Sequence, residues 1–364
     1  HGTAATATLL NANYDAPKGC PFSEAILWSN GEGATVWNRS SANRSPSSDP
    51  QSAQDLYLDY AARWYPYPFV AACAGNDPAK DGEHAEILHR LANGLVVGAA
   101  HNQNDPNRSH LKQMRSDSRG NNYGPAPNGW EFPHIVAPGT QVDTAPPGGS
   151  STPYPDCCTS IATPQVSGVA ASLQDYSSLL RYYPMGLMAI LLVAPEQDVH
   201  GRWPMDLNDT TDDWDGVGAL NGEIALQVAA AKRDGFEPYS TSGWDAGRMY
   251  SSSTPPGYWY SEVYNIAVLP GQTLRVALFA RSLVNCPQYD DPSSCTGNEW
   301  VKLGAAIQRD ATFLDWSCNN NGNYQYMGWT NDTGTFAFLK LKIWPQYYES
   351  TSYVDWGLAW TAVG

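Results

Sequence analysis

The pattern of apolar and polar positions changes near residue 232 and divides the chain into two parts. In the first part, unbroken apolar runs at 69–74 and 95–100 are typical of strands buried on both faces, as in a parallel sheet covered by helices. Apolar residues at helical spacing predict helices at 52–64, from Ser160 onward, at 185–193 and at 221–231. This alternation of strands and helices predicts an α/β fold.

In the second part, apolar and polar residues alternate, and Gly, Ser and Pro are frequent at 233–257. The alternation predicts strands at 264–269, 273–280, 301–307, 335–343 and 354–361. No convincing helical pattern occurs among them, so we expect an all-β sandwich of the jelly-roll type. The sequence thus predicts an α/β domain at 1–232, a linker at 233–257 and a β-sandwich domain at 258–364.

Composition narrows the classes of partner. The 364 residues include 36 acidic and 21 basic side chains, a formal net charge of -15, so there is no basic footprint for nucleic acid. The longest apolar run, at 188–194, is far shorter than the roughly 18 residues that a membrane span needs. We therefore expect neither a nucleic-acid partner nor a membrane span.

Cysteines and glycosylation acceptors indicate in which cellular compartment the protein resides. Cys286 and Cys295 bracket a turn-rich loop that a disulfide would close with little strain. The chain has seven cysteines, an odd number. Candidate N-glycosylation sites occur at Asn38, Asn43, Asn107, Asn208 and Asn331. Together these features favour a secreted, extracellular protein.

The sharpest motif surrounds Ser160. A serine at the start of an apolar helix lies where free backbone N–H groups and the helix dipole favour developing negative charge. Residues 158–170 (CTSIATPQVSGVA) resemble the nucleophile motif of the subtilisin-like serine proteases, Gly-Thr-Ser-Met-Ala followed by Pro-His-Val-Ala-Gly. The resemblance implies a subtilisin-like parallel sheet flanked by helices, a polypeptide substrate, and Ser160 as the nucleophile.

Further landmarks of the same family follow in order. Residues 71–77 (AACAGND) resemble the strand that ends in Ala-Gly-Asn, which implies that Asn76 helps the Ser160 N–H to hold the oxyanion. His1-Gly2-Thr3 is similar to the opening of the catalytic-histidine helix, which implies that His1 is the general base. Three more stretches match later landmarks, at 95–99, 135–139 and 216–221. In the C-terminal part, 264–271 and 333–336 resemble β-sandwich domains appended to secreted subtilases.

The family's substrate-pairing strand usually reads Asn-X-Ser-X-Gly. Residues 37–41 (WNRSS) are the best match, and 29–31 are the runner-up. The resemblance then implies that Asn38 and Ser40, together with Gly75, bind the substrate. Asn38 is also a glycosylation acceptor, and a glycan there would block antiparallel docking of a peptide.

The chain departs from the family in its acid. The family's Asp precedes the His, whereas Asp15 and every other carboxylate here follow His1. Three explanations stay open: the Asp-bearing segment is a separate, cleaved chain that stays associated, it lies outside the present sequence, or no competent triad ever existed. A triad without its Asp loses on the order of 10⁴ in turnover.

These observations predict a secreted serine endopeptidase whose orienting Asp comes from an associated N-terminal fragment. The alternative is an extracellular glycoprotein with a decayed subtilase fold and a structural or adhesive role. Cys158 replaces the family's Gly, and its use in a disulfide, with Cys73 as a candidate partner, is favoured over a nucleophilic role.

Metal and ligand sites are less clearly marked. The remaining histidines lack metal-ligand spacing, so we expect no metal site built from them. The acidic residues at 206–215 are a candidate Ca²⁺ site, although a solvated loop is the commoner meaning of such a run. The Trp and Tyr residues of the last domain fit either a sandwich core or a carbohydrate platform, and the core is favoured. The sequence marks no cofactor for certain, and Ca²⁺ is the one candidate.

Overall fold

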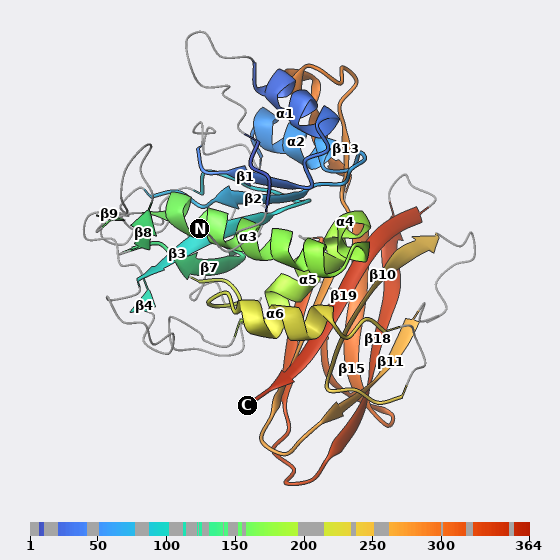
Figure 1. The fold of residues 1–364 in the computed structure, drawn as a ribbon. Coiled ribbons are helices and arrows are strands. Elements are labelled where there is room, and N and C mark those ends of the chain that lie inside the picture. Colours follow the sequence, from blue (N-terminus) through green and yellow to red (C-terminus); the bar gives the residue numbers. More distant parts are fainter. Residues whose placement is uncertain are drawn as a thin grey trace. The chain divides into compact units, whose positions relative to one another are not determined.

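The protein folds into two compact units (Figure 1). The computed structural model describes residues 7–10, 21–41, 51–76, 87–101, 112–113, 122, 124–125, 131–140, 142–144, 152–154, 158–195, 215–233, 238–250, 262–299, 301–317, 323–348 and 353–364. Unit 1 comprises His1–Ser172, Pro195–Leu220 and Cys286–Thr296. Unit 2 comprises Leu173–Ala194, Asn221–Asn285 and Gly297–Gly364.

The core of unit 1 is a mainly parallel sheet. Strands β1 (Val36–Arg39), β2 (Phe69–Cys73), β3 (Leu95–His101) and β7 (Ile135–Pro138) run parallel in that order, and β4 (Lys112–Gln113) pairs antiparallel with β3. Every residue of β2 is buried, which explains its unbroken apolar sequence. The predicted parallel sheet of an α/β fold is therefore confirmed.

Helices flank this sheet. They are α1 (Phe22–Gly31), α2 (Ala53–Ala61) and α3 (Thr159–Tyr176). Helix α2 begins at Ser52, whose hydroxyl accepts from the backbone N–H of Asp55 at 3.0 Å and caps the helix. Short two-stranded ribbons complete the described part of the unit: β5 (Gly124–Pro125) with β6 (Glu131–Phe132), and β8 (Val142–Thr144) with β9 (Thr152–Tyr154).

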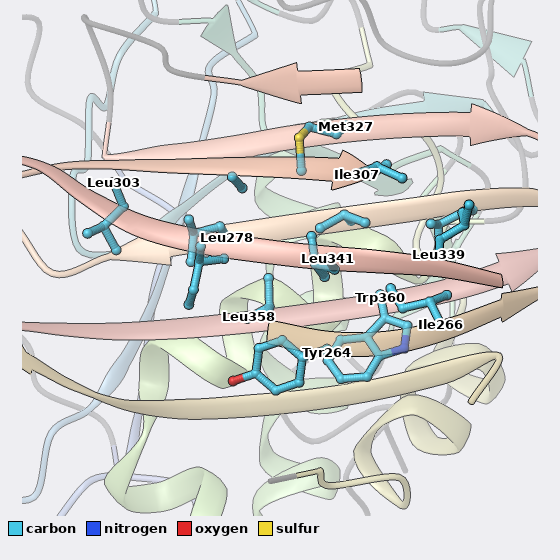
Figure 2. Close-up of a cluster of buried hydrophobic side chains, with 14 of the residues drawn as sticks. Tyr264, Ile266, Leu278, Leu303, Ile307, Met327, Leu339, Leu341, Leu358 and Trp360 are labelled. Atoms are coloured by element: carbon cyan, nitrogen blue, oxygen red, sulfur yellow. The ribbon is translucent and has the colours of Figure 1, made fainter. Parts of the chain in front are cut away.

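Unit 2 contains two four-stranded antiparallel sheets. One is ordered β10 (Ser242–Tyr250), β19 (Tyr353–Val363), β12 (Thr273–Ala280), β17 (Tyr324–Thr330). The other is ordered β11 (Glu262–Val268), β18 (Ala337–Tyr348), β15 (Val301–Arg309), β16 (Thr312–Ser317). Alternate residues of both sheets form one buried apolar cluster (Figure 2). The predicted all-β sandwich is confirmed.

Three helices belong to unit 2 as well: α4 (Leu179–Tyr182), α5 (Pro184–Val193) and α6 (Gly222–Ala229). Every residue of α5 is buried, and the helix is apolar on all sides because it packs on the sheet that contains β19 (Figure 1). Sequence periodicity marks these helices but does not show which unit they join. Part of the stretch expected as a linker forms β10, which pairs along its whole length with β19.

A disulfide-closed loop connects β13 (Leu283–Asn285) and β14 (Thr296–Glu299), and it contains a short 3-10 helix, η2 (Pro292–Ser294). The disulfide joins Cys286 and Cys295, the pair that the turn-rich spacing indicated. Within unit 1, the carbonyl of Tyr289 in this loop accepts a hydrogen bond from the Tyr57 hydroxyl at 2.9 Å. The loop is therefore anchored to α2.

Candidate active site

The candidate nucleophile, Ser160, lies in the first turn of α3. Pro164 stands one turn further along and has no backbone N–H to donate to the Ser160 carbonyl. The Ser40 hydroxyl donates to that carbonyl instead, at 3.2 Å. In return, the Ser160 hydroxyl donates to the carbonyl of Ser40 at 3.0 Å. The residue that follows β1 is thus hydrogen-bonded directly to the candidate nucleophile.

Asn76, which follows β2, faces the residue before Ser160. Its Oδ1 accepts from the backbone N–H and from the hydroxyl of Thr159, at 2.7 and 2.9 Å. Because the amide oxygen accepts both bonds, the Nδ2 hydrogens remain as donors. Thr159 is fully buried and also accepts from the N–H of Gly75 at 3.2 Å. The arrangement holds an amide donor at the start of the helix that carries Ser160, as an oxyanion site requires.

The residues expected to bind substrate lie around the same helix. The exposed Asn38 donates from Nδ2 to the Ser40 hydroxyl at 3.0 Å, and its Oδ1 accepts from Ser167 of α3 at 3.1 Å. Gly75 has a φ of +114°, and a Cβ there would lie 2.4 Å from the Asn122 side chain. Structure thus brings Asn38, Ser40 and Gly75 together beside α3, while their role in substrate binding stays a prediction.

Other family landmarks also come together. The stretch that starts at Gly216 runs beside β7, where the Leu220 N–H donates to the carbonyl of Val136 at 2.8 Å. Gly216 has a φ of +60°, and a Cβ there would lie 2.3 Å from the carbonyl oxygen of His134. Only glycine fits so close to a neighbouring backbone. Gln165, at the position where the family often has His, donates to the carbonyls of Pro138 and Ile161.

A buried charge cluster that sequence reasoning did not identify supports the Ser40 segment. Nδ1 of His89 lies 2.7 Å from Oδ1 of Asp55 on α2, and its Nε2 lies 2.8 Å from the carbonyl oxygen of Ser41. Both ring nitrogens face acceptors, which only the doubly protonated imidazolium satisfies. Arg39 of β1 lies 3.5 Å from the same carboxylate. The thiol of Cys73 also contacts the ring.

The ionisation of the cluster follows from these contacts. Burial by itself lowers the pKa of His89, but the charge and hydrogen bond of Asp55 outweigh it and raise the pKa to about 9. Burial raises the pKa of Asp55, but the opposing effects of His89 and Arg39 leave it below its ordinary value. Both groups are therefore charged at neutral pH. His89, with both nitrogens engaged, has no free nitrogen to act as a base toward Ser160.

A second buried carboxyl on α2 behaves differently. Asp59 accepts from the backbone N–H groups of Ala92 and Asn93 and from Nε2 of Gln51, at 2.7–3.0 Å. Burial nevertheless raises the pKa of Asp59 to about 7, because these bonds only partly replace the lost solvation. Sequence alone offered no signal for this network, since its members are far apart along the chain.

The burial of His134 leads to a separate prediction about the free energy of unfolding at acidic pH. It is buried at the start of the β7 segment, and its Nδ1 accepts from the Val96 N–H at 2.8 Å, so the ring is neutral. Burial lowers the pKa of His134 to about 3. The unfolded chain then binds one more proton than the folded chain between about pH 6.5 and 3. This residue should lower the free energy of unfolding by about 2 kcal/mol between pH 6.5 and pH 5.

Chemical denaturation of the wild type and of His134→Gln at pH 5, 6 and 7 measures this effect. The glutamine oxygen keeps an acceptor for the Val96 N–H, so the variant should lose the acid sensitivity of this site. The difference between the two proteins is the quantity to compare, because Asp59, with its raised pKa, contributes the opposite slope between about pH 4 and 7. Parallel pH profiles would contradict a buried, neutral His134.

Several expected site residues lie outside the described part of the chain. They are His1, the acceptors Asn43, Asn107 and Asn208, and the acidic positions 206–213. Asn331 is described, and it requires a correction: its side chain is fully buried, and its Nδ2 donates to the carbonyls of Val268 and Thr335, at 2.9 and 2.8 Å. A glycan on Nδ2 would have no room, so the folded protein does not carry one at this acceptor.

The structure also tests what the sequence predicted for the cysteines. Cys158 is disulfide-bonded, as favoured over a nucleophilic role. Cys73 is a free, buried thiol, so the suggested partnership between it and the cysteines near Ser160 is wrong. Within the described ranges, no group of His, Cys, Asp and Glu side chains is arranged to hold a metal ion. No helix in that part of the chain is long and apolar enough to cross a membrane.

Comparison with known proteins identifies the class. The model of the subtilase family, peptidase family S8, matches residues 1–185, which is half of the chain. The chain therefore belongs to the subtilase family, as its motifs indicated. No curated protein matches it.

Solved structures with a similar fold include three subtilase-related proteins. The structure of the subtilase cytotoxin SubAB is 18% identical to this chain. The match covers 59% of this chain and 67% of the SubAB chain, with a TM-score of 0.42. Sphericase is 19% identical, and the match covers 56% of this chain and 64% of the sphericase chain, with a TM-score of 0.38. The third is fervidolysin from Fervidobacterium pennivorans, a keratinolytic enzyme related to subtilisin, which is 15% identical. The match covers 89% of this chain and 36% of the fervidolysin chain, with a TM-score of 0.36. The chain thus spans about two thirds of the first two.

Proposed function

We propose that this chain is the catalytic part of a secreted serine endopeptidase. The observation that carries the proposal is the position of Asn76, whose oxygen accepts two hydrogen bonds from Thr159, the residue before Ser160, so that its Nδ2 hydrogens are left as donors. An amide donor and a serine at a helix N-terminus are the two parts that acyl transfer needs to stabilise a tetrahedral oxyanion. Membership of the subtilase family supports the same chemistry.

In the proposed mechanism, the Ser160 hydroxyl attacks the carbonyl carbon of the peptide bond and its proton passes to His1. The Asn76 amide and the Ser160 N–H donate to the oxyanion. His1 then gives the proton to the leaving amine, and water hydrolyses the acyl-enzyme by the same route. The resting hydrogen bond from Ser160 to Ser40 must break first, because the hydroxyl has a single proton to donate.

An Asp that orients His1 is proposed to come from a polypeptide segment outside these 364 residues, and it would hold the imidazole in the reactive tautomer. The edge at Asn38 and Ser40 is the proposed docking site for the substrate backbone. Secretion is part of the proposal because the Cys286–Cys295 disulfide suits an oxidising compartment.

Labelling of the native, full-length protein with a fluorophosphonate probe tests this proposal. We expect one label per chain, at Ser160, and none on Ser160→Ala. Asn76→Ala should be labelled roughly a hundredfold more slowly, because one oxyanion donor is lost.

Ser172→Ala is the matched control, since Ser172 is a serine of the same helix, α3, whose hydroxyl donates to the Gly168 carbonyl at 2.9 Å. It should be labelled at the wild-type rate. A native protein that takes up no label at Ser160 would sink the enzyme assignment and leave the structural or adhesive role. Equal rates for Asn76→Ala and the wild type would remove Asn76 from the oxyanion site.

A further inference from the structure

The two sheets of unit 2 differ in what covers their outer faces. The sheet that contains β19 carries α5 on its outer face, and the inner faces of both sheets form the shared core (Figures 1 and 2). Among the described residues of this unit, no helix packs on the outer face of the β11–β18–β15–β16 sheet. Large aromatic side chains are nevertheless exposed there: Phe313 is 51% exposed, Trp316 65% and Phe338 55%.

The strand register defines this face. Leu303, Ala305 and Ile307 of β15 point into the core, so the alternate positions of that strand point outward. Their cross-strand partners share the face. Among the residues of this sheet whose side chains the structure describes, the outward ones are Val263, Asn265, Ala267, Gly304, Ala306, Gln308, Phe313, Trp316, Phe338, Lys340, Lys342 and Trp344.

A β-bulge sets the aromatic edge of the face. The register between β15 and β16 shifts after Ile307, so Ala306 pairs with Trp316 whereas Gln308 pairs with Phe313. Leu314 is the extra residue, and it packs against the core cluster. Without the bulge, Phe313 and Trp316, three positions apart, would point to opposite faces. The bulge thus places two exposed aromatic residues on the same face of β16.

Small residues separate these rings from a basic strand. Lys342 and Trp316 lie on either side of Ala306, and Lys340 and Phe313 lie on either side of Gln308. The two lysines are two residues apart on one face, where like charges repel. None of the twelve outward residues is a carboxylate, although the whole chain carries 36 acidic side chains. An anionic group bound at this face would relieve that repulsion.

Gln308 adds an unsatisfied acceptor. Its side chain is 8% exposed, and its Oε1 has no hydrogen-bond partner among the described residues. A buried amide oxygen without a donor costs about 1–3 kcal/mol. Because this oxygen is enclosed, a ligand hydroxyl meets it only when the Gln308 side chain turns outward, and the unmet hydrogen bond favours that turn. Lys340, Gln308 and Phe313 lie in one cross-strand row, so charge, acceptor and ring are adjacent.

We propose that the outer face of the β11–β18–β15–β16 sheet binds an acidic oligosaccharide. A pyranose ring presents an apolar C–H face that packs on Trp316 and Phe313. Its hydroxyls donate to the Gln308 oxygen once that side chain turns outward, and its carboxylate groups meet Lys340 and Lys342. A polymer of uronic acids supplies all three features in each repeat. This binding is independent of the proposed protease activity, and it would hold the chain on a polysaccharide surface.

Isothermal titration of the full chain with oligogalacturonate, and with cellohexaose as the neutral counterpart, tests the proposal. We expect saturable binding of oligogalacturonate that weakens as salt is added, and binding of cellohexaose weaker by at least about tenfold. Trp316→Ala and Lys340→Gln should each weaken oligogalacturonate binding by at least about tenfold. Both residues are exposed, so circular dichroism should show that these variants fold.

Tyr289→Ala is the matched control. Tyr289 is 64% exposed, lies in unit 1, and uses only its backbone carbonyl in the contact with Tyr57. It should bind like the wild type. Absence of saturable binding, equal affinity for the neutral oligosaccharide, or wild-type affinity in Trp316→Ala would each overturn the proposal. So would sedimentation that shows a dimer abolished by Trp316→Ala, because a second copy of the chain would then occupy the face.

Discussion

Gly357→Ala should lower the free energy of unfolding by about 5 kcal/mol. A Cβ on Gly357 of β19 would lie 2.1 Å from the backbone nitrogen of Gly186 and 2.2 Å from the carbonyl carbon of Met185, both in α5. Helix α5 is buried on all sides, so it cannot move away without opening the contact with the sheet. Overpacking against backbone is costlier than against a flexible side chain, which places this change at the severe end of single substitutions.

Denaturant unfolding followed by near-ultraviolet circular dichroism measures the loss. Gly31→Ala is the matched control, because Gly31 ends α1 and nothing lies within 4 Å of a Cβ built there. That variant should stay within about 0.5 kcal/mol of the wild type. Gly186→Ala is intermediate, since its nearest neighbour is the ring of Trp244 at 3.1 Å. A loss below about 1 kcal/mol for Gly357→Ala would show that α5 does not lie so close to β19.

The second large effect concerns His89. His89→Leu should lower the free energy of unfolding by about 4 kcal/mol, because it leaves the Asp55 carboxylate buried without its imidazolium and the Ser41 carbonyl without its donor. The double variant Asp55→Leu/His89→Leu should recover part of this loss, since it removes the stranded charge. A double variant that loses as much as the two single variants together would contradict direct coupling.

The same pair predicts a dependence on alkaline pH. The pKa of His89 is about 9 in the folded protein and near 6.5 in the unfolded chain, so the folded state holds the extra proton between these values. The stabilisation by His89 is fully present below about pH 6.5 and is lost as the pH rises through about 9. Denaturation of the wild type from pH 6 to 10 should show this decline, and His89→Leu should not.

This cluster also links stability to the proposed chemistry. His89 holds the Ser41 carbonyl, and the neighbouring Ser40 exchanges two hydrogen bonds with Ser160. A loosened Ser40 segment should therefore change how Ser160 reacts with a fluorophosphonate. His89→Gln, which keeps one donor, should lie between the wild type and His89→Leu in labelling rate.

Much of the fold could be predicted from local pattern. The unbroken apolar runs marked β2 and β3, and the alternating segments of the C-terminal part marked most of the sandwich strands. The local pattern does not predict β16, β17 or β10. In β10, the stretch of Gly, Ser and polar residues lacks clear alternation. Its place is decided by pairing with β19, which lies more than 100 residues later. Local sequence carries no record of such a partner.

For the candidate site too, some features could be predicted from the sequence and others follow only from the tertiary structure. By itself, the sequence predicted Ser160 and Asn76 as site residues, because each lies in a short stretch that resembles a motif of the subtilase family. Only the tertiary structure decided that Ser40 bonds Ser160, that Asp55 charges His89, and that Asn331 is buried. The physical reason is that hydrogen bonding and desolvation depend on which distant segments meet in space, and a linear pattern of residue types does not contain those distances.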